Sequence, residues 1–160
     1  KLMDKIPSFT VDHLILLPGI YISRVDGDIT TYDMRTRRPN YDPLMDAATI
    51  HSFEHLFATF VRFFTPLKNS VIFFGPMGCQ TGFYLLVRNA CHQQVLDAVR
   101  LTLEKIIAYD GPVPGNSPVE CGNYSNSSLA AAQKEAAAYL EVLTSWQPEH
   151  LTYPTAPATE

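Results

Sequence analysis

The sequence predicts a single globular domain in which strands and helices share one core. Its 160 residues are 46% hydrophobic and 18% charged, a composition that suits one well-packed domain and is short for two. Two strand-like stretches flank an Asp-Gly-Asp turn at residues 26–28, as in a β-hairpin. Three longer stretches, residues 46–64, 93–108 and 128–144, carry their apolar residues largely on one side of a helix.

Four stretches have the composition of strands. Residues 21–25 and 29–35 alternate polar and apolar side chains and are joined by the Asp-Gly turn, so they predict the hairpin. Residues 71–74 and 81–88 are mostly apolar and predict two more strands. The turn between them contains two glycines, a proline and one cysteine, Cys79. Such a turn can bring backbone N–H groups close to the sulfur and leave the thiol facing a ligand.

The helices and the C-terminal segment follow from caps and breakers. Asp46 can cap the first helix, and no Gly or Pro interrupts residues 46–64. A turn-rich connection at residues 110–118 precedes Cys121, and Gly122 leaves the backbone there free to turn. Residues 147–160 contain three prolines and no apolar periodicity. We therefore expect a folded domain of residues 1–146 and a mobile tail of residues 147–160.

Charge and apolar runs limit the classes of partner. The formal net charge is −4, and the sequence contains no Lys/Arg cluster beyond the one at residues 35–38. We expect no nucleic-acid or anionic-membrane partner, but a small molecule or another protein. No apolar run approaches the length of a membrane span, and no signal peptide is evident, so we expect a cytoplasmic protein. The cysteines are too few and too widely spaced for a disulfide framework; they are Cys79, Cys91 and Cys121.

The first predicted helix carries the pattern His-x-x-Glu-His at residues 51–55. Because positions i and i+4 lie on one helix face, His51 and His55 can reach one metal ion, with Glu54 at the edge of that face. Two unrelated histidines on an amphipathic helix are the alternative. Cys121 is a candidate third ligand, which would leave one coordination position open.

The remaining ionisable groups near such a site are Cys79 and Glu54. A metal that polarises a carbonyl, flanked by a thiolate and a carboxylate, suits proton abstraction next to that carbonyl. A small buried residue at a strand start is the other interpretation of Cys79. Two rival functions stay open: a His-x-x-Glu-His metallopeptidase and a non-catalytic metal-binding domain. Nothing near Cys91 suggests chemistry.

Five motifs together resemble one known family, the LuxS family of S-ribosylhomocysteine lyases. The resemblance runs from about residue 8 to the last helix, in the family's order and spacing. The motifs are His-Ser-Phe-Glu-His at 51–55, Gly-Pro-Met-Gly-Cys-Gln-Thr-Gly at 75–82, Glu-Cys-Gly at 120–122, Ser-Phe-Thr-Val-Asp-His at 8–13, and Tyr-Asp-Met-Arg at 32–35 with Pro39-Asn40.

The resemblance implies an α+β fold, with a largely antiparallel sheet packed against helices. It also implies a homodimer with active sites at the subunit interface. The implied reaction splits S-ribosyl-L-homocysteine into L-homocysteine and 4,5-dihydroxy-2,3-pentanedione, the precursor of the autoinducer-2 signal of quorum sensing. The catalytic domain would be residues 1–146.

The resemblance also assigns roles to individual residues. One divalent metal per subunit would be iron(II) in the cell, and zinc or cobalt in purified protein. Residues 73–75, Phe-Phe-Gly, depart from the polar residues that many members carry there, in the part that grips the homocysteine end. The implied roles are metal ligation by His51, His55 and Cys121, proton transfer by Cys79 and Glu54, ribose contact by Ser8, His13 and Arg35, and contact with the amino-acid end by Arg62.

Overall fold

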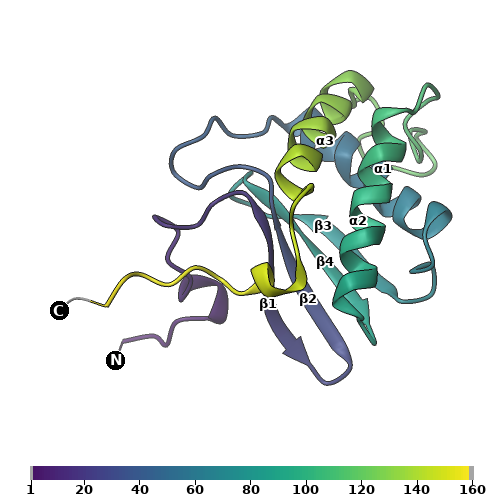
Figure 1. Ribbon diagram of the computed structural model, residues 1–160. Coiled ribbons are helices and arrows are strands. Elements are labelled where there is room, and N and C mark those ends of the chain that lie inside the picture. Colours follow the sequence, from purple (N-terminus) through teal and green to yellow (C-terminus); the bar gives the residue numbers. More distant parts are fainter. Residues whose placement is uncertain (1, 159–160) are drawn as a thin grey trace.

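The computed structural model describes residues 2–158, which form one four-stranded antiparallel sheet covered on one face by three α-helices (Figure 1). The strand order is β1-β2-β4-β3. The α+β fold is therefore confirmed. The elements are β1 (Gly19–Asp26), β2 (Ile29–Arg35), α1 (Ala47–Phe64), β3 (Val71–Pro76), β4 (Gly82–Arg88), α2 (His92–Ile107) and α3 (Leu129–Leu143), with short 3-10 helices at Pro7–Phe9 and Pro148–Leu151.

The predicted hairpin is present, with Asp26 paired to Ile29 across a two-residue turn. Gly27 has a φ of +60°, a conformation that glycine adopts without a steric penalty. The caps are also as predicted for α1, since the Asp46 side chain accepts a hydrogen bond from the Thr49 N–H at 2.8 Å. Capping and hairpin chemistry thus determine where these elements begin and turn.

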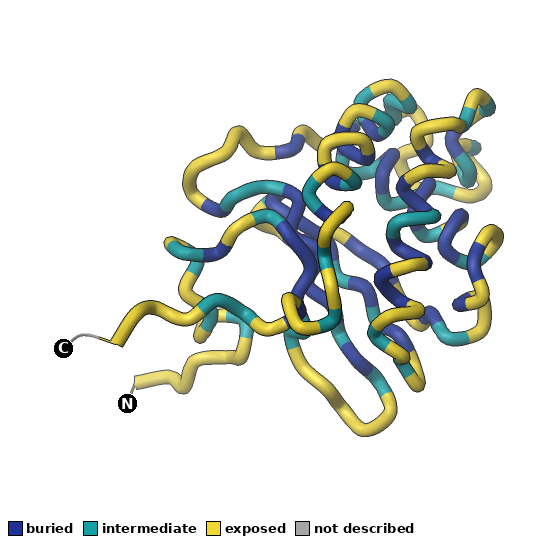
Figure 2. Tube along the Cα trace, in the orientation of Figure 1, coloured by how far each residue is buried: buried dark blue, intermediate teal, exposed yellow. Residues whose placement is uncertain are grey.

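The core lies between the sheet and the helices, where Figure 2 colours the tube dark blue. Its centre is a stack of aromatic rings. Phe53 of α1 lies 4.8 Å from Phe83 of β4, and Phe57 lies 4.4 Å from Phe74 of β3, measured between ring centroids. Such pairs add about 0.5–1.5 kcal/mol each to the free energy gained by burial. Helix α1 is therefore firmly held against one face of the sheet.

Successive residues of a strand point to opposite faces of a sheet, so the side chains of β2 alternate between the helix-covered face and the opposite face. Tyr32 and Met34 join the core under the helices. Asp33 and Arg35 project from the other face, which we call the open face. The N-terminal residues and the C-terminal segment both lie on that side of the molecule (Figure 1).

The first part of the C-terminal segment packs against the sheet. Trp146 donates its indole N–H to the Ile20 carbonyl at 2.9 Å, and Leu151 is 1% exposed. Tyr153 stacks on Tyr21 of β1, with ring centroids 5.2 Å apart. The mobility expected for residues 147–160 stays a prediction for the part beyond these contacts. Within residues 2–158, none of the helices has the length and apolar character that crossing a membrane requires.

The close pairing of β2 and β4 gives a test of the fold. A methyl group added at Gly82 would lie 2.5 Å from the Met34 carbonyl oxygen, beside the backbone of Arg35. Gly82→Ala should lower the free energy of unfolding by about 1–3 kcal/mol, because the two strands must move apart. Gly78→Ala, in the same hairpin, meets nothing within 4 Å and is the matched control. Equal denaturation midpoints for the two variants would contradict this packing.

Candidate active site and metal centre

The two histidines of α1 lie one helical turn apart with their rings on the same face. Their centroids are 4.5 Å apart and both side chains are half-buried. Cys121, in the loop before α3, brings its Sγ within 3.2 Å of the His51 Nε2. One candidate ligand atom from each of His51, His55 and Cys121 lies within 4.8 Å of the others. The structure therefore brings together the three residues that the sequence predicted as metal ligands.

Backbone carbonyls of that loop orient both imidazoles. The Nδ1–H of His51 donates to the Asn126 carbonyl, and the Nδ1–H of His55 donates to the Pro114 carbonyl, each at 2.8 Å. A carbonyl can only accept, so these bonds place the proton on Nδ1 and leave the Nε2 lone pair free to bind a metal. Gly115, with φ +69°, lets the loop pass close to His55.

The donor set fits a divalent transition metal. Two imidazole nitrogens and one thiolate suit zinc or iron(II), and three protein ligands are typical of a catalytic site with one open position. A structural site would normally close with a fourth ligand. A His-x-x-Glu-His peptidase would usually take its third ligand as a carboxylate from a later helix, whereas the third residue here is a cysteine from a loop. Both rival functions are disfavoured on this ground.

A second group of predicted site residues lines a cavity of about 340 Å³ on the open face. Ser8 and His13 come from the N-terminal segment, Arg35 from the end of β2, and Cys79 from the turn between β3 and β4. His13 and Cys79 also line a neighbouring cavity of about 440 Å³. The residues expected to contact ribose thus lie together with the thiol expected to move protons.

Arg35 is the cation nearest to the Cys79 thiol in this group. Its Nη1 lies 3.8 Å from Sγ and donates to the Thr81 hydroxyl at 2.8 Å, and that hydroxyl is itself 3.0 Å from Sγ. Burial alone would lower the pKa of Arg35, but the ion pair with Asp33 outweighs it and raises that pKa. The guanidinium therefore stays charged, with its Nη1 close to the Cys79 sulfur.

Glu54 and Arg62 occupy other parts of α1. Glu54 is half-buried and precedes His55, one of the candidate metal ligands. Arg62, in the last turn, donates to the Ala58 carbonyl at 2.7 Å and lines neither of the two open-face cavities. A role for Arg62 at the amino-acid end of a substrate stays a prediction.

The two groups lie on opposite faces of one sheet. The candidate metal ligands lie on the helical side, whereas Arg35 and Tyr84 project from the open face into the cavity that Cys79 lines. Neither open-face cavity has a metal ligand in its lining. One group contains the candidate metal ligands and the other contains Cys79. Within a single chain the sheet separates these two groups.

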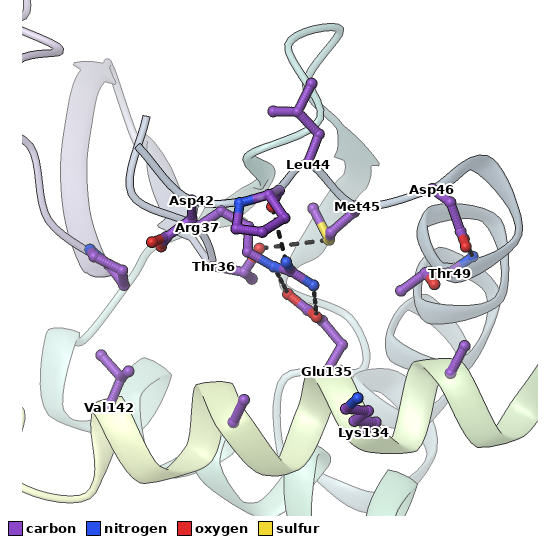
Figure 3. A pocket seen from close by; sticks show the side chains of 14 residues that line it. Thr36, Arg37, Asp42, Leu44, Met45, Asp46, Thr49, Lys134, Glu135 and Val142 are labelled. Carbon is purple, nitrogen blue, oxygen red and sulfur yellow. Dashed lines mark hydrogen bonds and ion pairs between the residues drawn. The ribbon is translucent and has the colours of Figure 1, made fainter. Parts of the chain in front are cut away.

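A further cavity, of about 640 Å³, involves none of the predicted site residues. Figure 3 shows it between the loop that follows β2 and helix α3, crossed by a bidentate ion pair between Arg37 and Glu135. The shorter of these two contacts is 2.6 Å, between Nη2 and Oε2. Because Arg37 and Glu135 neutralise each other, we interpret this cavity as a packing gap where the ion pair links the loop to α3, and not as a binding site.

Comparison with known proteins shows the family of this chain. The sequence model of the S-ribosylhomocysteinase (LuxS) family matches residues 6–150. An S-ribosylhomocysteine lyase of Finegoldia magna is 46% identical over 157 residues, covering 95% of this chain and 99% of that protein. The protein of the same name from Clostridium beijerinckii is 42% identical, covering 95% of this chain and 99% of that protein. The chain belongs to the S-ribosylhomocysteinase (LuxS) family.

Sequence reasoning missed several residues that contact the predicted site residues. Asp33, two positions before Arg35 on the same strand face, could have been found from the period of the strand alone. Thr81 lies within the Gly-Pro-Met-Gly-Cys-Gln-Thr-Gly motif. Asn126 and Pro114 act only through backbone carbonyls, for which side-chain identity gives no signal. Tyr153 lies in a segment expected to be mobile.

Metal binding by this LuxS-family chain has a direct test. Cys121→Ala removes one of three ligands, so its affinity for zinc should fall by more than about 100-fold, since even loss of an outer hydrogen bond costs about 10–100-fold. Elemental analysis after dialysis should find metal in the wild-type protein and not in this variant. Cys91→Ala is the control, because Cys91 is exposed at the start of α2. Metal retention by the Cys121 variant would exclude this residue as a ligand.

Proposed function

We propose that this protein is a metal-dependent S-ribosylhomocysteine lyase. It cleaves the thioether of S-ribosyl-L-homocysteine to L-homocysteine and 4,5-dihydroxy-2,3-pentanedione, the autoinducer-2 precursor, without adding water or an oxidant. Membership of the LuxS family and the names of the relatives support the reaction. The observation that carries the proposal is the three-ligand cluster, which leaves one position for substrate.

The chemistry requires a carbonyl to move along the sugar. In the open-chain aldose it must shift from C1 to C2 and then to C3, after which the proton at C4 becomes acidic and the thiolate at C5 can leave. Each shift takes a proton from one carbon and returns one to its neighbour. The bound metal would supply Lewis-acid polarisation of the substrate oxygens. Its ligands would be His51, His55 and Cys121.

Cys79 and Glu54 would divide the proton transfers. We assign Cys79 to protons on carbon, because the Arg35 Nη1 lies 3.8 Å from its sulfur and because it lines a cavity with the residues expected to contact ribose. We assign Glu54 to protons on oxygen, because it lies beside the metal ligand His55. Ser8, His13 and Arg35 would hold the ribose part, and Arg62 the amino-acid end. Phe73, 53% exposed on the open face, is an apolar candidate for the homocysteine chain.

A homodimer would unite the two halves of the site. Because the metal ligands and Cys79 lie on opposite sides of the sheet in one chain, we propose that Cys79 of each subunit serves the metal of the other. Exposed apolar side chains of the open face, such as Phe9 and Phe73, support an interface there. One isologous interface would then generate two equivalent sites.

The metal, the cellular location and the extent of the catalytic unit also belong to the proposal. We propose iron(II) as the metal in the cell, with zinc or cobalt in purified protein, since the N and S donors suit all three. We propose a cytoplasmic location and a role in homocysteine recycling and autoinducer synthesis. The catalytic unit would be residues 1–146, followed by the segment of residues 147–160.

Incubation with S-ribosylhomocysteine tests the reaction. Free thiol, followed with Ellman's reagent, should appear with the metal-loaded wild-type protein. Cys79→Ala and Glu54→Gln should each lower turnover by at least about 100-fold, the scale of a lost acid/base group, while keeping metal. No thiol release from folded, metal-loaded protein would exclude the lyase. Wild-type turnover by either variant would remove that residue from the mechanism.

Mixed dimers test which subunit supplies the thiol. Co-expression of Cys79→Ala and Cys121→Ala chains with two different tags allows the heterodimer to be purified. If Cys79 serves the metal of the other subunit, one of the two sites is intact, and activity should be about half that of wild type. If each chain builds its own site, both sites are defective and the heterodimer is inactive. An inactive heterodimer that carries metal in one subunit would overturn the shared-site proposal.

A further inference from the structure

The C-terminal segment reaches the buried ion pair behind the Cys79 thiol. The Tyr153 hydroxyl donates to the Asp33 Oδ2 at 2.6 Å. Its ring stacks on Tyr21 with an interplanar angle of 20°, and Leu151, two residues earlier, is buried. Tyr153 is therefore fixed from two directions, by its ring and by its hydroxyl.

Asp33 links Tyr153 to Arg35 by accepting hydrogen bonds from both. The carboxylate is fully buried, and the Arg35 guanidinium binds both of its oxygens, Nε to Oδ1 at 3.1 Å and Nη2 to Oδ2 at 2.7 Å. Oδ2 therefore accepts two hydrogen bonds, one from each partner. A buried ion pair is stable only when the remaining hydrogen-bonding capacity of both groups is met. On the carboxylate, the Tyr153 hydroxyl supplies the hydrogen bond that Arg35 does not.

Arg35 carries the connection to the sulfur. Its Nη1, the only terminal nitrogen not bound to Asp33, donates to Thr81 and lies 3.8 Å from the Cys79 Sγ. Any rotation of the Asp33 carboxylate would turn the guanidinium plane with it, because the two groups share two hydrogen bonds. The direction of Nη1 toward the thiol thus depends on how Asp33 is held.

We propose that Tyr153 is a positioning residue which, by holding Asp33, fixes Arg35 beside the Cys79 thiol. The catalytic meaning of this role rests on the proposed function, in which Cys79 transfers protons, but the contacts themselves do not. Burial and the Asp33 carboxylate raise the pKa of Tyr153 far above its ordinary value. The phenol consequently stays protonated and remains a donor at neutral pH.

Alkylation of Cys79 without substrate tests the proposal. Neutral iodoacetamide reports the reactivity of the thiol, whereas anionic iodoacetate also responds to a cation beside it. The ratio of the two rates, measured on the Cys79 peptide by mass spectrometry, reports how Arg35 is placed. Tyr153→Phe should lower that ratio about three- to tenfold, toward the value of Arg35→Ala, because it removes one charge-assisted hydrogen bond.

Tyr139→Phe is the matched control. It deletes the same atom from a buried tyrosine, whose hydroxyl donates to the Gly19 carbonyl at 2.7 Å and not to the ion pair. It should lower the melting temperature and leave the alkylation ratio unchanged. An unchanged ratio in Tyr153→Phe would overturn the proposal, and so would an equal fall in both variants, which would indicate general loosening.

Turnover gives the second readout and separates the two proposals. If the protein is a lyase, Tyr153→Phe should lower kcat about three- to tenfold, and Tyr139→Phe should not. Wild-type kcat in Tyr153→Phe, with the ratio lowered, would limit the residue to placing Arg35 and overturn its catalytic meaning. If the wild-type protein releases no thiol, the lyase is excluded, whereas a lowered ratio in Tyr153→Phe still supports the positioning role.

Discussion

The two-residue period of β2 is the constraint on which the rest of the structure depends. Tyr32 and Met34 are committed to the core beneath the helices, so Asp33 and Arg35 must emerge on the opposite face. A shift of one residue in the pairing would bury the ion pair among aromatic rings and expose the core. Packing on one face of the sheet therefore fixes the register in which Arg35 meets Cys79 on the other.

The metal centre depends on a different period and on a loop. Helical spacing places the two imidazoles together, but spacing alone does not choose which ring nitrogen carries the proton. The connection between α2 and α3 makes that choice through the carbonyls of Pro114 and Asn126, and it also delivers Cys121. A loop without regular structure thus provides both the hydrogen bonds that orient the two imidazoles and the candidate thiolate ligand.

Much of this arrangement could be predicted from the sequence because it follows local rules. The hairpin at Gly27, the capped helix that begins after Asp46 and the ligand pair on its face each depend on residues a few positions apart. The motif order identified Cys121 and Cys79 despite their distance in the chain. What could not be predicted depends on contacts across the fold. The pairing of Arg37 with Glu135 and of Tyr153 with Asp33 joins residues 98 and 120 positions apart, and no local pattern records either contact.

The long separation between Asp33 and Tyr153 has a consequence during protein synthesis. At a translation rate of about 5–20 residues per second, the 120 residues between them take roughly 6–24 s to add. During that interval the residues Asp33 and Arg35 have been synthesised, but the side chain that completes their hydrogen bonding has not. A side chain made late in synthesis therefore completes the hydrogen bonding of an ion pair made early, and a nascent chain released before Tyr153 would lack that hydrogen bond.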